Sequence, residues 1–159
     1  MREDKIITPD KALQIAKLLH NEKKSIVLVG GCFDILHLGH ITFLEQAKKQ
    51  GDILFVFVES DHMIKHTKGD TRPVNNQHDR VKILSHLDLI DYLIPLSDKP
   101  DYDELVIHIK PAIIATTRGD ANRFHKERQA NEVGARVVDV TDEISNKSTT
   151  KIIKILEEI

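Results

Sequence analysis

The chain has 159 residues, of which 40% are hydrophobic, and this length and composition suit one globular domain. Its formal net charge of -2 gives no indication of a nucleic-acid or membrane-surface partner, so we expect neither. The single cysteine, Cys32, excludes an intrachain disulfide. Together with an N-terminus that lacks the apolar core of a signal peptide, it predicts a cytoplasmic protein.

Helix-like and strand-like patterns alternate along the chain. The helices show apolar residues at a period near 3.6, and the strands are short apolar runs bounded by Gly, Pro or polar clusters. The predicted elements, in chain order, are a helix from Pro9 within the N-terminal segment 1–22, a strand at 25–30, a helix from Ile41 to about Gln50, a strand at 53–58, a loop at 66–74, a helix at 77–87, a strand at 92–96, a helix at 102–109, a strand at 112–116, a helix at 122–133, a strand at 136–140 and a helix after Ser148.

This alternation predicts the fold class. It is typical of an α/β protein in which a five-stranded parallel sheet has right-handed crossovers and helices on both faces. We expect one domain over residues 1–159. In such sheets ligands bind beyond the carboxyl ends of the strands. The segments that follow the strands, at 31–40, 66–74, 116–121 and 148–150, are therefore expected to line one rim.

The most informative segment is Gly31-Cys32-Phe33-Asp34-Ile35-Leu36-His37-Leu38-Gly39-His40, which joins a predicted strand to a predicted helix. A turn of this kind presents backbone N–H groups and the positive end of the helix dipole, and both favour phosphate. Two imidazoles add donors, and Gly39 allows close approach of a nucleotide to the backbone. The segment predicts a site of attack on a nucleotide phosphate. The alternatives are that His37 and His40 are ordinary surface residues or a pair of metal ligands.

This segment resembles the HxGH signature of the nucleotidyltransferase superfamily, and is most similar to heptose-phosphate adenylyltransferases and glycerol-3-phosphate cytidylyltransferase. The resemblance covers about residues 25–155 and implies a Rossmann-like catalytic core of that extent. It implies that His37 and His40 are catalytic. Asp34 is expected to hold the turn through backbone hydrogen bonds. The turn residues implied to contact the nucleotide are Gly31, Cys32, Phe33 and Gly39.

The segment Lys68-Gly69-Asp70-Thr71-Arg72-Pro73-Val74 extends the resemblance, because heptose-phosphate adenylyltransferases carry a similar KGxxRPV segment. The resemblance implies a catalytic role for Lys68 and a contact from Arg72 to the substrate phosphate. Related enzymes also bind that phosphate with an arginine at the position of Arg80. The alternative for Lys68 and Arg72 is that they belong to a solvated basic loop, and the alternative for Arg80 is that it is an exposed cation on a helix.

Ser148-Thr149-Thr150-Lys151-Ile152 resembles the STTKI element of the same enzymes. There, hydroxyls and helix N-terminal amides bind the β- and γ-phosphates, which implies this role for Ser148, Thr149 and Thr150. A plain N-cap is the alternative, although a cap needs one hydroxyl and not three.

Two segments depart from the family pattern. The turn Thr116-Thr117-Arg118-Gly119-Asp120-Ala121 keeps only the Gly-Asp of the Gly-Asp-Asp-Trp or Gly-Gly-Asp-Tyr found in relatives. We still expect Arg118, Gly119 and Asp120 to bind the nucleotide, with Asp120 on the ribose or on a magnesium-bound phosphate. Before Ser148, the segment 142–147 lacks the arginine of the cytidylyltransferases, and Lys147 is the substitute cation.

Together the motifs imply an enzyme that joins a nucleoside monophosphate to a phosphorylated small molecule and releases pyrophosphate. The function expected first is a D-glycero-D-manno-heptose 1-phosphate adenylyltransferase. We expect ATP as the nucleotide, with CTP as the alternative, Mg²⁺ as cofactor without direct side-chain ligands, and a homodimer. The other candidates are a cytidylyltransferase for glycerol 3-phosphate or another alcohol phosphate, an FMN adenylyltransferase, and a nucleotide-binding regulator without catalysis.

Overall fold

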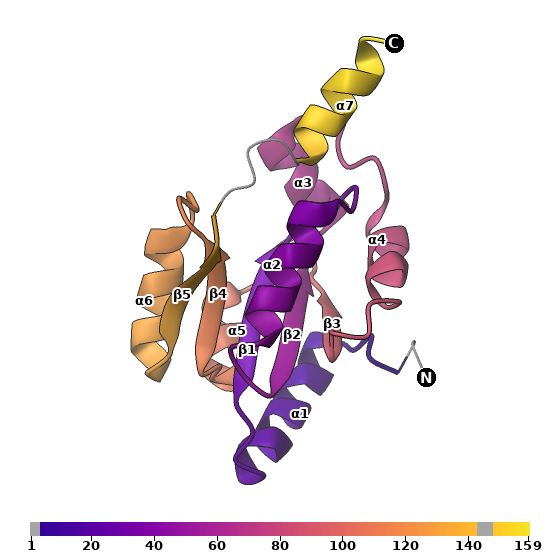
Figure 1. The fold of residues 1–159 in the computed structure, drawn as a ribbon. Helices are drawn as coiled ribbons and strands as arrows, with labels where there is room; N and C mark the ends of the chain where they lie inside the picture. The colour runs from indigo at the N-terminus through magenta and orange to yellow at the C-terminus, as the bar shows by residue number, and fades with distance from the viewer. Residues whose placement is uncertain (1–3, 143–147) are drawn as a thin grey trace.

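A computed structural model describes residues 4–142 and 148–159 (Figure 1). At its centre is a parallel five-stranded sheet with the strand order β3-β2-β1-β4-β5. This architecture confirms the α/β fold class expected from the alternating pattern. The strands are β1 (Ile26–Gly31), β2 (Ile53–Val58), β3 (Tyr92–Pro95), β4 (Ile113–Thr117) and β5 (Arg136–Thr141).

Five of the helices begin at a residue whose side chain caps them, whereas among the described residues those at Leu38–Lys48 and Arg123–Val133 begin without a side-chain cap. The side chains of Thr8, Ser60, Asn76, Asp101 and Ser148 each accept a hydrogen bond from the backbone N–H three residues further on. None of the helices in the described part of the chain is long and apolar enough to cross a membrane. The helices are α1 (Pro9–Asn21), α2 (Leu38–Lys48), α3 (Asp61–Lys68), α4 (Gln77–Leu84), α5 (Tyr102–Ile109), α6 (Arg123–Val133) and α7 (Thr149–Glu157).

The prediction of a loop at 66–74 is partly wrong, because residues 66–68 form the last turn of α3. This helix is short and polar, and only one of its side chains, Ile64, is buried. The segment has only two apolar residues, Met63 and Ile64, which are too few to establish a helical period, so the sequence pattern did not separate it from a loop. The cap at Ser60 and the burial of Ile64 fix it instead.

Helices cover both faces of the sheet and enclose two apolar cores. Successive side chains of β1 point to opposite faces of the sheet, as the period of a strand requires. Val27 and Val29 pack toward α2 and α4, whereas Ile26 and Leu28 pack toward α1, α5 and α6. Because both faces are buried, β1 and β2 are apolar along almost their whole length.

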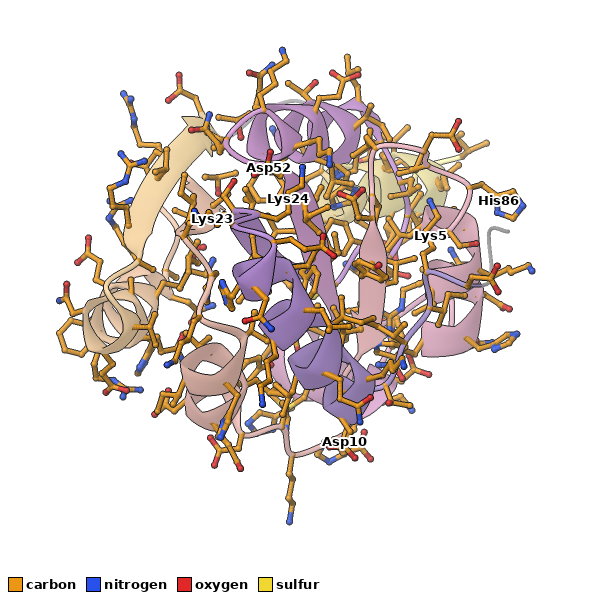
Figure 2. All side chains as sticks on the ribbon, turned by 90° about the horizontal axis from the view of Figure 1, so that it is seen from below. Lys5, Asp10, Lys23, Lys24, Asp52 and His86 are labelled. Atoms are coloured by element: carbon orange, nitrogen blue, oxygen red, sulfur yellow. The ribbon has the colours of Figure 1, made fainter. Side chains whose placement is uncertain are left out.

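The order of the strands fixes where a ligand can bind. From β1 the chain first moves outward to β2 and β3, and it then returns to pair β4 on the other side of β1. The connections after β1 and β4 therefore diverge, and a crevice opens between their carboxyl ends. Figure 1 shows α7 standing beyond this end of the sheet. Figure 2 views the opposite end, where Lys23, Lys24 and Asp52 lie near the starts of β1 and β2.

Candidate active site

A buried carboxylate, Asp34, braces the turn between β1 and α2. Its side chain accepts hydrogen bonds from Arg72 Nε at 2.6 Å, Val74 N at 2.9 Å and Asn75 N at 2.9 Å. Burial raises the pKa of Asp34, but the hydrogen bonds from Asn75, Val74 and Arg72 outweigh this and hold the pKa below its usual value. The expected role of Asp34 is confirmed. Arg72, which we expected on the substrate phosphate, instead pairs with Asp34 inside the protein.

Arg80 holds three segments of the rim together. Its side chain is 0% exposed, and every guanidinium nitrogen donates to the protein. Nε donates to Asn75 O at 3.0 Å, and Nη1 donates to Cys32 O at 2.6 Å. Nη2 donates to Glu59 O at 2.7 Å and to Asp61 Oδ1 at 2.8 Å. Arg80 lines neither pocket, so the structure does not bring it to the place expected for the substrate phosphate, and its 0% exposure contradicts the alternative of an exposed helix cation.

The two histidines of the HxGH segment form a stacked pair at the start of α2. Their ring centroids lie 3.9 Å apart with an interplanar angle of 25°. His37 is the N-cap residue, yet its side chain makes no capping hydrogen bond. In the described part of the chain, Nδ1 of His37 and Nδ1 of His40 are buried and have no hydrogen-bond partner. Buried polar atoms are rarely left unpaired, so this pair indicates a ligand that completes it.

Phe33 supports this pair from within the turn. Its ring is 4% exposed and packs against His40 with a centroid separation of 5.3 Å. Its φ of 48° lies in the left-handed region, which is uncommon for a residue other than glycine. A Cβ at Gly31 would lie 2.9 Å from the Phe33 ring, so Gly31 is required for this packing. Phe33 also contributes to the lining of the pocket beside the histidines.

Burial keeps both imidazoles neutral at pH 7. Burial, together with a smaller effect of the neighbouring His37, lowers the pKa of His40 to about 4, although a backbone hydrogen bond to Ile35 and the charge of Asp34 act in the opposite direction. Burial also lowers the pKa of His37. A neutral imidazole carries one N–H donor and one acceptor nitrogen, so each ring can offer at most one N–H to a phosphate oxygen.

We expect His40 in the free protein to titrate near pH 4, well below the usual value for histidine of about 6.5. Because the unfolded chain binds this proton at higher pH, stability is present above pH 6.5 and is lost as the pH falls toward 4. The loss from His40 amounts to about 3 kcal/mol. NMR titration of the ring signals, with His40→Asn for assignment, gives the pKa directly. A midpoint near 6.5 would contradict the buried position of the ring.

The histidines line a small pocket beyond the carboxyl ends of β1 and β4. Its volume is about 250 Å³. Gly39 lies in its wall, and Ser148 approaches it from the start of α7. Thus two segments that are far apart in the sequence, the HxGH turn and the first residue of the STTKI element, meet at one pocket.

The three hydroxyls of the STTKI element have different surroundings. Ser148 lines the small pocket, and its oxygen caps α7 by accepting from Lys151 N at 3.2 Å. Thr149 is buried, and its hydroxyl donates to Ile35 O in the HxGH turn at 3.2 Å. Thr150 is exposed and lines neither pocket. The structure therefore brings Ser148 to the histidines, whereas Thr149 ties α7 to the turn.

The turn after β4 contributes one of its three expected residues. Asp120 lines the small pocket, and Lys126 forms an ion pair with its Oδ2. Gly119 has a φ of 81° and supplies the left-handed bend that this turn needs. Arg118 is exposed and pairs with Asp142 at 3.2 Å, and neither it nor Gly119 lines a pocket. The expected substitute cation, Lys147, lies outside the described residues.

A larger pocket of about 880 Å³ adjoins the small one. Lys68, at the end of α3, lines this pocket, and its contact with substrate stays a prediction. The carboxyl end of β2 adds Glu59, and the start of α5 adds Tyr102. The hydroxyl of Tyr102 lies 2.7 Å from each carboxylate oxygen of Glu59. Burial raises the pKa of Glu59, and a hydrogen bond from Tyr102 opposes this effect.

Sequence reasoning missed Glu59, Tyr102 and Lys126. Glu59 directly follows a strand, and that position alone gave a usable signal. Tyr102 and Lys126 lie in helices whose surroundings depend on contacts from distant segments. For these two residues the sequence carried no local signal.

The crevice lies where the strand order reverses, between β1 and β4. The turn beside it presents groups that favour phosphate. These two features together define the class of α/β nucleotide-binding proteins. Comparison with protein families agrees, since the family described as cytidylyltransferase-like matches residues 28–155. The chain belongs to this cytidylyltransferase-like family.

Known proteins similar to this chain include the bifunctional protein HldE of two bacteria. The protein from a Nitratiruptor species is 42% identical over a stretch that covers 88% of this chain and 29% of the relative. The protein from Aliarcobacter butzleri is 37% identical, and the match covers 96% of this chain and 31% of the relative. The chain therefore spans less than a third of the length of these relatives.

Solved structures show the same fold. The lipopolysaccharide core biosynthesis protein from Thermoplasma volcanium is 31% identical, with a TM-score of 0.62 over 76% of this chain and 97% of that one. Pantoate-beta-alanine ligase from Francisella tularensis has a TM-score of 0.66 and covers 97% of this chain and 78% of its own. Its sequence identity is 16%, so it supports the fold alone.

Proposed function

We propose that the chain transfers a nucleotidyl group from a nucleoside triphosphate to a phosphorylated small molecule and releases pyrophosphate. One observation carries the proposal: Nδ1 of His37 and Nδ1 of His40 are buried without a partner in the described structure, at the N-terminus of α2. The helix N-terminus favours an anion, and the imidazoles offer donors beside it. The family match supports the same chemistry.

The reaction would proceed as an in-line displacement at the α-phosphorus. An oxygen of the acceptor phosphate forms the new bond, and the bond to the β-phosphate oxygen breaks, so that pyrophosphate leaves. His37 and His40 would donate to oxygens that gain charge in the transition state. Ser148 and the first amides of α7 would hold the leaving pyrophosphate. A general base is not needed, because the acceptor phosphate is already an anion.

The larger pocket suits an acceptor that carries both a phosphate and hydroxyl groups. Lys68 provides a mobile cation for the phosphate. Glu59 and Tyr102 present a half-buried carboxylate and a phenol, which pair well with hydroxyl groups. We propose D-glycero-D-manno-heptose 1-phosphate as the acceptor and ATP as the nucleotide, as the KGxxRPV resemblance implies. The similarity to the bifunctional HldE proteins supports this choice.

Magnesium would enter with the nucleotide. No group of three or more His, Cys, Asp or Glu residues that could hold a metal ion occurs among residues 4–142 and 148–159. The small pocket does contain the carboxylates of Asp120 and Asp142, so its residues fit an ion that is held mainly by phosphate oxygens. Such an ion would neutralise charge on the triphosphate.

Pyrophosphate release with Mg²⁺ tests the proposal when ATP and CTP are each combined with heptose 1-phosphate, glycerol 3-phosphate and FMN. Turnover with ATP and heptose 1-phosphate alone is the expected result. Turnover of CTP with glycerol 3-phosphate, or of ATP with FMN, would keep the chemistry and change the assigned substrate. Tight nucleotide binding without turnover in any combination would favour a non-catalytic regulator.

Glu59→Gln is expected to raise the KM for a polyhydroxylated acceptor by about tenfold, because the amide accepts weaker hydrogen bonds from the acceptor hydroxyls than a carboxylate does. The KM for ATP should stay within about twofold. Steady-state kinetics with heptose 1-phosphate provide the measurement, and Asp98→Asn, at an exposed position outside both pockets, is the control. An unchanged acceptor KM would remove Glu59 from acceptor recognition.

We also propose that residues 25–155 act as one catalytic core, that the protein works in the cytoplasm and that it forms a homodimer. The exposed side chains of Leu38, Ile155 and Leu156 provide apolar surface near the rim, which supports association. Light scattering at micromolar concentration measures the oligomeric state, and a monomeric mass would refute the dimer.

A further inference from the structure

The two pockets share a wall that contains a single cation among the described residues. Of the five residues common to both linings, only two are charged, and only Lys126 is positive. The other lysines and arginines that line a pocket belong to the larger one alone, and His37 and His40 belong to the smaller one. The shared residues are Gly30, Gly31, Cys32, Asp120 and Lys126.

The ammonium group of Lys126 is held in a defined place. It forms an ion pair with Asp120 Oδ2 and donates to Thr116 Oγ1 at 3.2 Å. Asp120 is fixed in turn, because it accepts from the Thr116 hydroxyl at 2.5 Å and from Asn122 N at 2.7 Å. An ammonium has three N–H donors. Asp120 and Thr116 use two of them, and within the described structure the third is left for a ligand.

The chemistry proposed for this site needs a cation at such a place. The attacking phosphate and the α-phosphate are both anions, and they must approach until a bond can form. Two unit charges 4 Å apart repel each other by about 4 kcal/mol at an effective dielectric constant of about 20. A cation fixed between the two pockets offsets this repulsion without any rearrangement during the reaction.

We propose that Lys126 binds the acceptor phosphate where the two pockets meet and sets it in line with the α-phosphate. This inference rests on the proposed nucleotidyl transfer. The acceptor oxygen bonds to the α-phosphorus while pyrophosphate leaves with the electrons of the broken P–O bond, and Lys126 keeps its protons throughout. Gly30 and Gly31 leave this part of the wall without side chains, so the phosphates can approach each other there. Asp120 acts as the positioning residue for Lys126.

Lys126→Gln tests the inference. We expect kcat/KM for the acceptor to fall about 10- to 100-fold, as the loss of a hydrogen bond to a charged group implies. The Kd for ATP should change by less than about threefold, and Lys126→Arg should restore much of the lost activity, because a guanidinium also binds phosphate. Lys17→Gln is the matched control, since Lys17 is exposed on α1 and lines neither pocket.

A second readout does not require turnover. Inorganic phosphate is titrated by calorimetry into protein that is saturated with a non-hydrolysable ATP analogue. Wild type and Lys17→Gln should bind phosphate equally, and Lys126→Gln should bind it at least about tenfold more weakly. Equal phosphate affinity in all three, or no binding to wild type, would overturn the inference. If no substrate pair is turned over, the proposed function fails, whereas the phosphate titration still decides the role of Lys126.

Discussion

Replacing His40 by alanine is expected to lower kcat about 10²- to 10³-fold and to leave the Kd for ATP within a few-fold. The reason is that its donor would act on oxygen that gains charge only in the transition state, and losing one such donor in other enzymes has an effect of this size. Single-turnover measurement of pyrophosphate release, together with calorimetric titration of ATP, separates the two quantities. The result would also decide against a non-catalytic regulator.

The neighbouring His37 allows a sharper test. Because the two rings stack at 3.9 Å, their contributions should not be independent, and His37→Ala/His40→Ala should lose less activity than the product of the single losses. His78→Ala is the control, since His78 is exposed on α4 and lines neither pocket. A His40→Ala protein with wild-type kcat would remove the pair from the chemistry.

Replacing Arg80 by methionine is expected to reduce the free energy of unfolding by about 3–5 kcal/mol, the usual effect of removing one partner from a buried charged network. Methionine fills part of the volume but donates to none of the four oxygens that Arg80 binds, which are the carbonyls of Cys32, Glu59 and Asn75 and a carboxylate oxygen of Asp61. Urea unfolding monitored by circular dichroism gives the change.

The Arg80 result separates a structural role from phosphate binding. Arg136→Met, at an exposed position on the edge strand β5, should change the free energy of unfolding by less than about 0.5 kcal/mol. If Arg80→Met kept wild-type stability and raised the acceptor KM, Arg80 would be a phosphate ligand after all. If Arg80→Met is less stable but binds ATP with wild-type affinity at low temperature, the role of Arg80 is to hold the segments of the rim together.

Local patterns predicted the sheet and the HxGH turn because their determinants are local. Apolar runs that are buried on both faces identify β1 and β2, and the HxGH turn needs only a strand, a helix and the residues between them. The roles of Arg72 and Arg80 depended on what surrounds them, and a charged residue in a sequence gives no sign that it is buried. Asp34 and the rim carbonyls surround these arginines only after the chain has folded.

The same reasoning explains Lys126. It lies in α6, a helix that looks like an ordinary solvated one because most of its residues are polar or charged. Its position between two pockets results from the way α6 packs beside β4. Its partner Thr116 lies near the end of β4, and its partner Asp120 lies in the turn between β4 and α6. Three-dimensional placement, and not residue type, distinguishes it from the other lysines.

The hydrogen bond from Thr149 to Ile35 joins segments that are 114 positions apart. Contacts of such long sequence separation form only when nearly the whole chain is available. The histidine turn is synthesised before Ser148 and Thr149, and the strands β2 to β5 lie between them in the sequence. A chain shortened before α7 would therefore contain both histidines but lack the residues proposed to hold the pyrophosphate, so nucleotidyl transfer would require that α7 has docked on the turn.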